Sequence, residues 1–142
     1  MLARYHLPEM PESWNQLAFD DHVYDANTKG RKTPTHLIMD AWIKGLRSLT
    51  VAYEYWVQPD AAREILRAAE ITGIAVRIGL EFQVPFYGRF VSVFWIPRGF
   101  SSHEDFLEFL HSPKVAEMMK RGREVLRWRR DRVLHCLALC GR

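Results

Sequence analysis

Short β-rich runs alternate with helical runs through residues 19–82, and this alternation constrains the fold more than any other feature of the chain. Strands are predicted at residues 19–24, 49–53 and 75–82, and helices at residues 33–47 and 59–72. Thr33-Pro34 is typical of a helix start, and Gly73 is typical of a helix end. Because a helix between two strands forms a right-handed crossover, these strands should pair in parallel.

A fourth β-rich run, residues 90–96, follows the turn residues Pro85 and Gly88. A link of seven residues is too short for a crossover helix. This strand therefore either pairs antiparallel with the previous one or is reached by a loop excursion. Residues 101–104 (Ser-Ser-His-Glu) predict a capping box before a short helix, and a long helix over residues 113–139 is expected to project from the domain.

Composition limits the class of protein. With 142 residues, 48% of them apolar and 26% charged, the chain is long enough for one cored domain. No apolar run approaches the roughly 20 residues of a membrane span, and the first residues lack the apolar core of a secretory signal. We therefore expect a cytoplasmic protein with no membrane partner, in which Cys136 and Cys140 are reduced thiols.

The formal net charge of +3 is unevenly distributed. Residues 113–142 contain nine Lys or Arg and three acidic residues, whereas residues 1–112 contain eleven and fourteen. A basic helix that carries Trp128 would suit nucleic acid or an acidic partner. A solvated basic face is the favoured interpretation, because only one aromatic side chain interleaves with the charges.

Imidazole and carboxylate side chains stand where the predicted strands end. His22 is near the end of the first strand, Glu54 follows the second, and Glu81 is near the end of the third. Sheets of α/β proteins keep their chemistry at the carboxyl ends of their strands. Asp20 and Asp25 are predicted to be catalytic acid or base groups, although aspartates at a strand–loop junction are also typical of turns.

The loop that precedes the first helix is basic. Cationic side chains and the free main-chain amides of a helix start together suit a phosphate group. The predicted phosphate-binding residues are Lys29, Gly30, Arg31, Lys32, Thr33 and Thr35. A solvent-exposed basic loop is the alternative interpretation.

A series of short motifs runs through residues 19–109 in a fixed order. They are Asp20-Asp21-His22, Thr28-Lys29-Gly30, Thr33-Pro34, Gly45-Leu46, Gly73-Ile74, Gly79-Leu80-Glu81 and Gly88-Arg89. This series resembles the PHP superfamily, the polymerase and histidinol phosphatase domains. The scaffold positions of that family match better here than its catalytic ones.

The resemblance implies an α/β fold of partial or distorted (βα) barrel type, with mainly parallel strands and a long C-terminal helix. Proteins of that family hold divalent metals and hydrolyse phosphate esters. His22 and Glu81 stand at ligand positions, and Glu54 adds an oxygen donor, so one divalent metal (Zn, Mn or Mg) is the expected cofactor. Tyr24 and Ser92 stand where the family has histidines. The alternative is that His22 and Glu81 only pair with each other across neighbouring strand ends.

Three functions are compatible with these patterns. The first is a degenerate PHP-like module with a binding, regulatory or structural role, whose partner is a phosphorylated small molecule or another part of a larger polypeptide. The second is a metal-dependent phosphoesterase with a reduced metal site. The third is a nucleic-acid-associated module. The expected segments are a lead-in (1–18), a βα domain (19–112) and a basic helix (113–142). Four strands do not close a barrel, which favours the first function.

Overall fold

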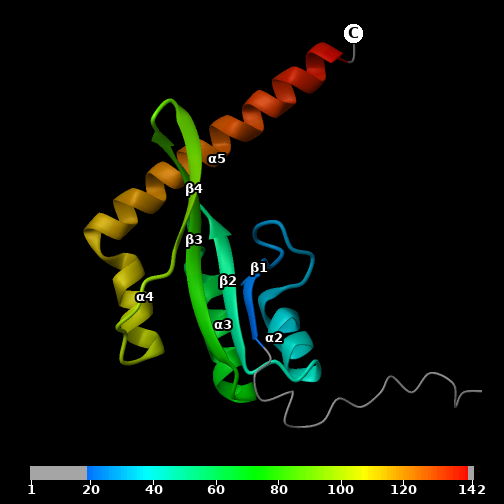
Figure 1. The fold of residues 1–142 in the computed structure, drawn as a ribbon, viewed down its shortest axis with the longest axis vertical. Coiled ribbons are helices and arrows are strands. Elements are labelled where there is room, and N and C mark those ends of the chain that lie inside the picture. The colour runs from blue at the N-terminus through cyan, green and yellow to red at the C-terminus, as the bar shows by residue number, and fades with distance from the viewer. Residues whose placement is uncertain (1–18, 141–142) are drawn as a thin grey trace, which may run out of the picture.

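The computed structural model describes residues 19–140 as a mixed α/β unit with a curled four-stranded sheet and a long C-terminal helix (Figure 1). The elements in chain order are β1 (Phe19–Val23), α2 (Pro34–Ile43), β2 (Ser48–Glu54), α3 (Pro59–Thr72), β3 (Ala75–Phe86), β4 (Arg89–Trp95), α4 (His103–His111) and α5 (Pro113–Cys140). The predicted lead-in, residues 1–18, lies outside the described residues. Within the described part, none of the helices is long and apolar enough to cross a membrane.

The sheet order is β1-β2-β3-β4. β2 pairs in parallel with both β1 and β3, as the crossovers through α2 and α3 require, whereas β4 pairs antiparallel with β3. The open alternative for residues 90–96 is therefore settled in favour of antiparallel pairing. The predicted end of β3 at residue 82 was too early, because Tyr87 and Gly88 both have left-handed φ angles (46° and 76°) and form a tight two-residue turn.

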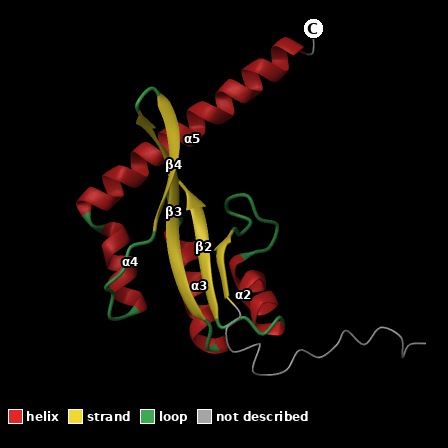
Figure 2. Cartoon of the chain, in the orientation of Figure 1, coloured by secondary structure: helices red, strands yellow, loops and turns green. Residues whose placement is uncertain are grey.

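The core lies between the sheet and its crossover helices (Figure 2). Alternate residues of β2, namely Leu49, Val51 and Tyr53, are at most 1% exposed and pack with Ile38 of α2 and Ile65 of α3. Side chains of a strand alternate between its two faces. The residues between them in β2 therefore point to the opposite face of the sheet, where the polar side chains gather.

α2 ends before the predicted residue 47. Gly45 has a φ of 73°, and the Leu46 N–H donates to the Ala41 carbonyl at 2.9 Å. A glycine in the left-handed region with this returning hydrogen bond terminates a helix. Gly45 therefore terminates α2, whose last residue is Ile43.

The capping box of α4 is displaced by one residue from its prediction. Ser102 is the N-cap, and its Oγ accepts from the Asp105 N–H at 3.1 Å. The Asp105 carboxylate in turn accepts from the Ser102 N–H at 3.2 Å, which is the role predicted for Glu104. The predicted start of the long helix at residue 113 is confirmed, since α5 begins at Pro113.

The first half of α5 packs against the domain, and the second half projects from it, as predicted (Figure 1). Val115, Met119 and Gly122 are the buried residues of this helix. A Cβ on Gly122 would lie 2.2 Å from the Tyr55 carbonyl oxygen, so α5 approaches the end of β2 as closely as a glycine permits. Farther along, Val133 is 58% exposed.

The sheet curls until its two edge strands touch. The ring of His22 on β1 stacks on the ring of Phe94 on β4, with centroids 4.7 Å apart and planes inclined by 9°. Gly79 of β3 lies beneath them, because a Cβ there would be 2.5 Å from the Phe94 ring. A contact between opposite edges of the sheet makes it a half barrel whose concave face includes these rings.

Candidate functional site at the strand ends

Two carboxylates lie side by side at the carboxyl ends of the central strands. Glu54 of β2 and Glu81 of β3 are in register, so their side chains project from the same face. The Lys29 ammonium, from the loop after β1, lies 2.8 Å from Glu54 Oε1 and 3.6 Å from Glu81 Oε2. A cation of the chain itself therefore lies beside both carboxylates.

Tyr24 joins this cluster from the end of β1. Its hydroxyl donates to Glu81 Oε2 at 2.6 Å and also lies 3.0 Å from His22 Nε2. A tyrosine hydroxyl has one proton, and Tyr24 uses it in the hydrogen bond to Glu81. The contact with His22 therefore requires a proton on Nε2, which donates to the tyrosine oxygen. His22 Nε2 is also 3.8 Å from Glu81 Oε2, which agrees with the predicted alternative that these two residues pair.

These contacts fix the charge of the cluster. The hydrogen bond from Tyr24 is the main reason that the pKa of Glu81 is lowered, and the nearby Lys29 lowers it further. The hydrogen bond to Glu54 raises the pKa of Lys29, while burial and the bond to Glu81 raise the pKa of the Tyr24 hydroxyl. At neutral pH the cluster therefore holds an ionised Glu81, a charged Lys29 and a neutral Tyr24.

The donor set does not fit a divalent metal. Nε2 of His22, the nitrogen that faces this cluster, donates to Tyr24 and is therefore not available to ligate a metal there. Lys29 lies where a cation bridging the two glutamates would have to lie. Across residues 19–140, no group of three or more His, Cys, Asp or Glu side chains is arranged to hold a metal ion. Of the predicted trio, Glu54 and Glu81 pair with the Lys29 ammonium, and His22 lies beside Glu81.

Asp25 anchors the loop that carries Lys29. It is 0% exposed, and its carboxylate accepts from the Tyr53 hydroxyl at 2.6 Å and from the Asn27 N–H at 2.8 Å. Its carbonyl oxygen accepts from the Gly30 N–H at 2.8 Å. A buried carboxylate with these partners is suited to holding a loop in place, which is the turn chemistry weighed against the predicted acid or base role.

Asp20, the other predicted acid or base, is exposed at the opposite end of the same segment. Its Oδ1 accepts from the His22 N–H at 3.3 Å. Its neighbour Asp21 instead accepts from Thr50 Oγ1 at 3.1 Å and from Arg77 at 2.6 Å on the concave face. The three aspartates of this segment, Asp20, Asp21 and Asp25, therefore have different hydrogen-bond partners and do not form one site.

The predicted phosphate-binding residues do not form one cradle. Thr33 is the N-cap of α2 and accepts from the His36 N–H. The N–H and hydroxyl of Thr35 both donate to Glu64 Oε1 of α3, at 2.9 and 2.6 Å. The helix start thus already binds an anion that belongs to the chain.

The basic side chains of the loop point in different directions. Lys32 pairs with Asp40 of α2 at 2.6 Å, while Lys29 turns to the glutamates of β2 and β3. Arg31 is exposed and lines a shallow hollow of about 390 Å³ beside α2. Most of the charges that predicted phosphate binding are therefore neutralised within the chain.

Sequence reasoning missed the contacts between the strand ends and α5. Arg129 donates to Gln83 Oε1 at 2.7 Å, and its guanidinium lies 4.9 Å from the centre of the Tyr55 ring. Arg123 similarly lies 5.2 Å from the centre of the Trp56 ring. The only local signal is a basic helix in a chain with aromatic residues after a buried strand, and it does not specify these pairs.

No protein-family model matches the chain, and no curated protein matches it. A predicted metal-dependent phosphoesterase from Bifidobacterium adolescentis is similar over 54% of this chain and 26% of its own, with 22% identity and a TM-score of 0.48. An amidohydrolase from Chromobacterium violaceum is similar over 68% and 34%, with 19% identity and a TM-score of 0.49. A two-domain protein from Bacteroides vulgatus, containing a predicted PHP-like metal-dependent phosphoesterase, is similar over 73% and 32%, with 14% identity and a TM-score of 0.44. The chain thus spans about a third or less of each structure.

Proposed function

We propose that this chain is a non-catalytic PHP-like module with a binding or structural role in a larger protein. The observation that carries the proposal is that the charged groups expected to bind metal and phosphate are engaged within the chain. Lys29 bridges the carboxylates of Glu54 and Glu81, and Glu64 accepts hydrogen bonds from the N–H and the hydroxyl of Thr35. Such groups are not free to stabilise a phosphoryl transition state.

The proposal is tested by hydrolysis of a generic phosphoester in the presence of added manganese or zinc. We expect no turnover that depends on Glu81, so wild type and Glu81→Gln should give the same rate. Turnover that is lost in Glu81→Gln but kept in the matched control Asp20→Asn would overturn the proposal. That result would identify the phosphoesterase with a reduced metal site instead.

The projecting half of α5 is the surface that such a module would use. Residues of this helix repeat at alternating four- and three-residue intervals, which is the spacing of a helix-packing seam: Val115, Met119, Gly122, Leu126, Arg129, Val133, Cys136 and Cys140. The first three are buried against the domain, whereas the last three are exposed. The seam therefore runs beyond the surface that covers it.

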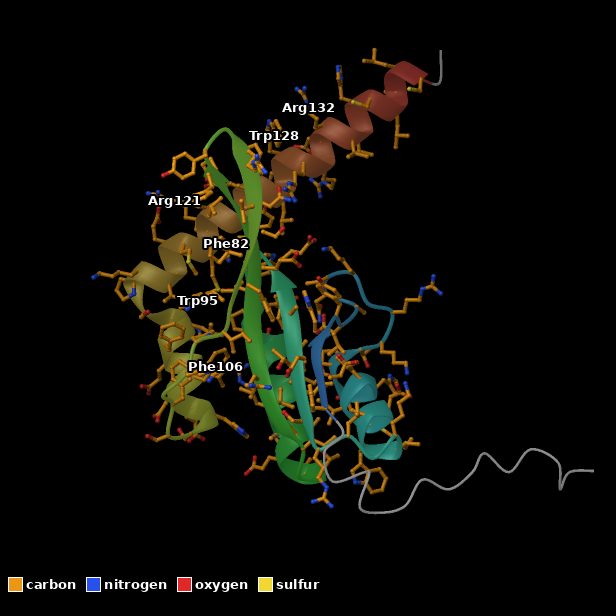
Figure 3. The ribbon with its side chains drawn as sticks, in the orientation of Figure 1. Phe82, Trp95, Phe106, Arg121, Trp128 and Arg132 are labelled. Carbon is orange, nitrogen blue, oxygen red and sulfur yellow. The ribbon has the colours of Figure 1, made fainter. Side chains whose placement is uncertain are left out.

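The charge of the projecting half of α5 supports one kind of partner. The projecting half carries Arg130 and Arg132 beside its apolar side chains, and Figure 3 shows Trp128 and Arg132 on this part of the helix. The Arg132 guanidinium lies 5.6 Å from the centre of the Trp128 ring. A protein surface that is apolar and rimmed by carboxylates, such as another part of a larger polypeptide, complements this pattern.

Chemical unfolding separates the two halves of the seam. Val133→Ser combined with Cys136→Ser should change the free energy of unfolding by less than about 0.5 kcal/mol, because both side chains are exposed in the described chain. The control Met119→Ala, 4% exposed in the wild type, should cost about 2–3 kcal/mol. An equal loss in both variants would show that the far half belongs to this domain's own core.

A further inference from the structure

A closed loop delivers Lys29 to the strand-end carboxylates. The loop is closed by a hydrogen bond from the Ala26 N–H to the Lys32 carbonyl at 2.8 Å and by the buried Asp25 at its base. Gly30 permits the close approach, because a Cβ there would lie 2.0 Å from the Tyr24 carbonyl oxygen. The position of the Lys29 side chain is therefore set by a loop with its own internal contacts.

The carboxylate pair needs a cation. Glu54 and Glu81 are opposite each other on neighbouring strands, and two like charges at this separation repel. Lys29 supplies one positive charge and hydrogen-bond donors, and it also lies 5.0 Å from the centre of the Tyr24 ring. Magnesium binds carboxylate oxygens at about 2.0–2.1 Å, so a metal ion and this ammonium cannot occupy the same place.

We propose that Lys29 is a built-in replacement for a divalent cation, and that removing its amine turns Glu54 and Glu81 into a divalent-cation site. The inference rests on the proposed function, because it takes the wild-type site to be free of metal chemistry. Lys29 contacts Glu54 Oε1 and Glu81 Oε2, and Tyr24 also donates to Glu81 Oε2. Without the amine, the Glu54 carboxylate loses its cation and Glu81 keeps only the hydrogen bond from Tyr24.

The test is calorimetric titration of manganese into the full chain. Lys29→Ala should bind manganese at least ten times more tightly than wild type, and the added substitution Glu81→Gln should remove that gain. Lys32→Ala is the matched control, because it removes the same charge from the same loop, where its partner is Asp40 rather than the carboxylate pair. Lys32→Ala should bind manganese no better than wild type.

A second measurement follows the melting temperature. The substitution Lys29→Ala leaves two carboxylates without their cation, so manganese should raise the melting temperature of this variant more than that of wild type. Circular dichroism verifies that the variant is folded.

Folded Lys29→Ala that gains no manganese affinity would overturn this inference and leave the proposed function intact. Equal tight binding by wild type and Lys29→Ala would overturn it as well, since the ammonium would then not exclude the metal. Manganese-dependent hydrolysis by wild type that requires Glu81 is the separate result that overturns the proposed function.

Discussion

Replacing Gly122 with alanine tests how α5 is held against the domain. In an isolated helix this change is favourable by up to about 1 kcal/mol, because glycine has low helix propensity. In this structure the new methyl group would lie 2.2 Å from the carbonyl oxygen and 2.8 Å from the carbonyl carbon of Tyr55. The contact is with main chain, so no side-chain rotation can relieve it.

Tyr55 is not free to move aside. Its φ is 61°, and its N–H donates to the Glu81 carbonyl at 2.9 Å. α5 must therefore withdraw, which costs about 1–3 kcal/mol of overpacking energy, and the arginine–aromatic contacts of Arg129 and Arg123 add about 0.5–1 kcal/mol each when they are lost. After subtracting the propensity gain, we expect the free energy of unfolding to fall by about 2 kcal/mol.

Urea unfolding followed by circular dichroism and tryptophan fluorescence measures this loss. The exposed residue Lys120 lies on the same helix, and Lys120→Ala is the matched control, with an expected change of less than about 0.5 kcal/mol. If Gly122→Ala proves as stable as wild type or more stable, helix propensity outweighs the contact. The docking of α5 described above would then be refuted.

Two further substitutions test the site. The pKa of Glu81 lies below its ordinary value of 4.5, so its contribution to stability is present above pH 4.5 and is lost as the pH falls through the folded value. Glu81→Gln should therefore be less stable than wild type at pH 7, and acid titration of the unfolding midpoint should show the difference shrinking below pH 4.5; a constant difference would contradict this. Asp25→Asn places an amide against the hydroxyl of Tyr53 and should cost about 2–3 kcal/mol in urea unfolding, whereas the exposed control Asp20→Asn should cost little.

The βα alternation was predictable because its signals are local. Thr33-Pro34 starts α2, Gly73 (φ 75°) ends α3, and each helix lies between strands that pair in parallel. The tight turn between β3 and β4 was less accessible, because Tyr87 adopts a left-handed φ that a bulky residue rarely does. The sequence pattern therefore located the four strands but placed the end of β3 too early.

The sequence predicted where the candidate site lies but did not predict which groups bind each other there. Register put Glu54 and Glu81 together, because both follow from where parallel strands end. Nothing in the sequence states that Lys29 points to these carboxylates while Lys32 pairs with Asp40, since both lysines lie in one polar loop. The direction of each side chain depends on how the loop closes, which is a tertiary property.

The charged side chains of Glu54, Glu81 and Lys29 on the concave face are partly buried. Buried charges are tolerated only when partners compensate them. A dication between Glu54 and Glu81 would balance two negative charges, whereas Lys29 balances one. The remaining charge on Glu81 is stabilised by the short hydrogen bond from the Tyr24 hydroxyl. The Lys29 ammonium and the Tyr24 hydroxyl thus stabilise the carboxylate pair together. Removing either group should increase the repulsion between Glu54 and Glu81.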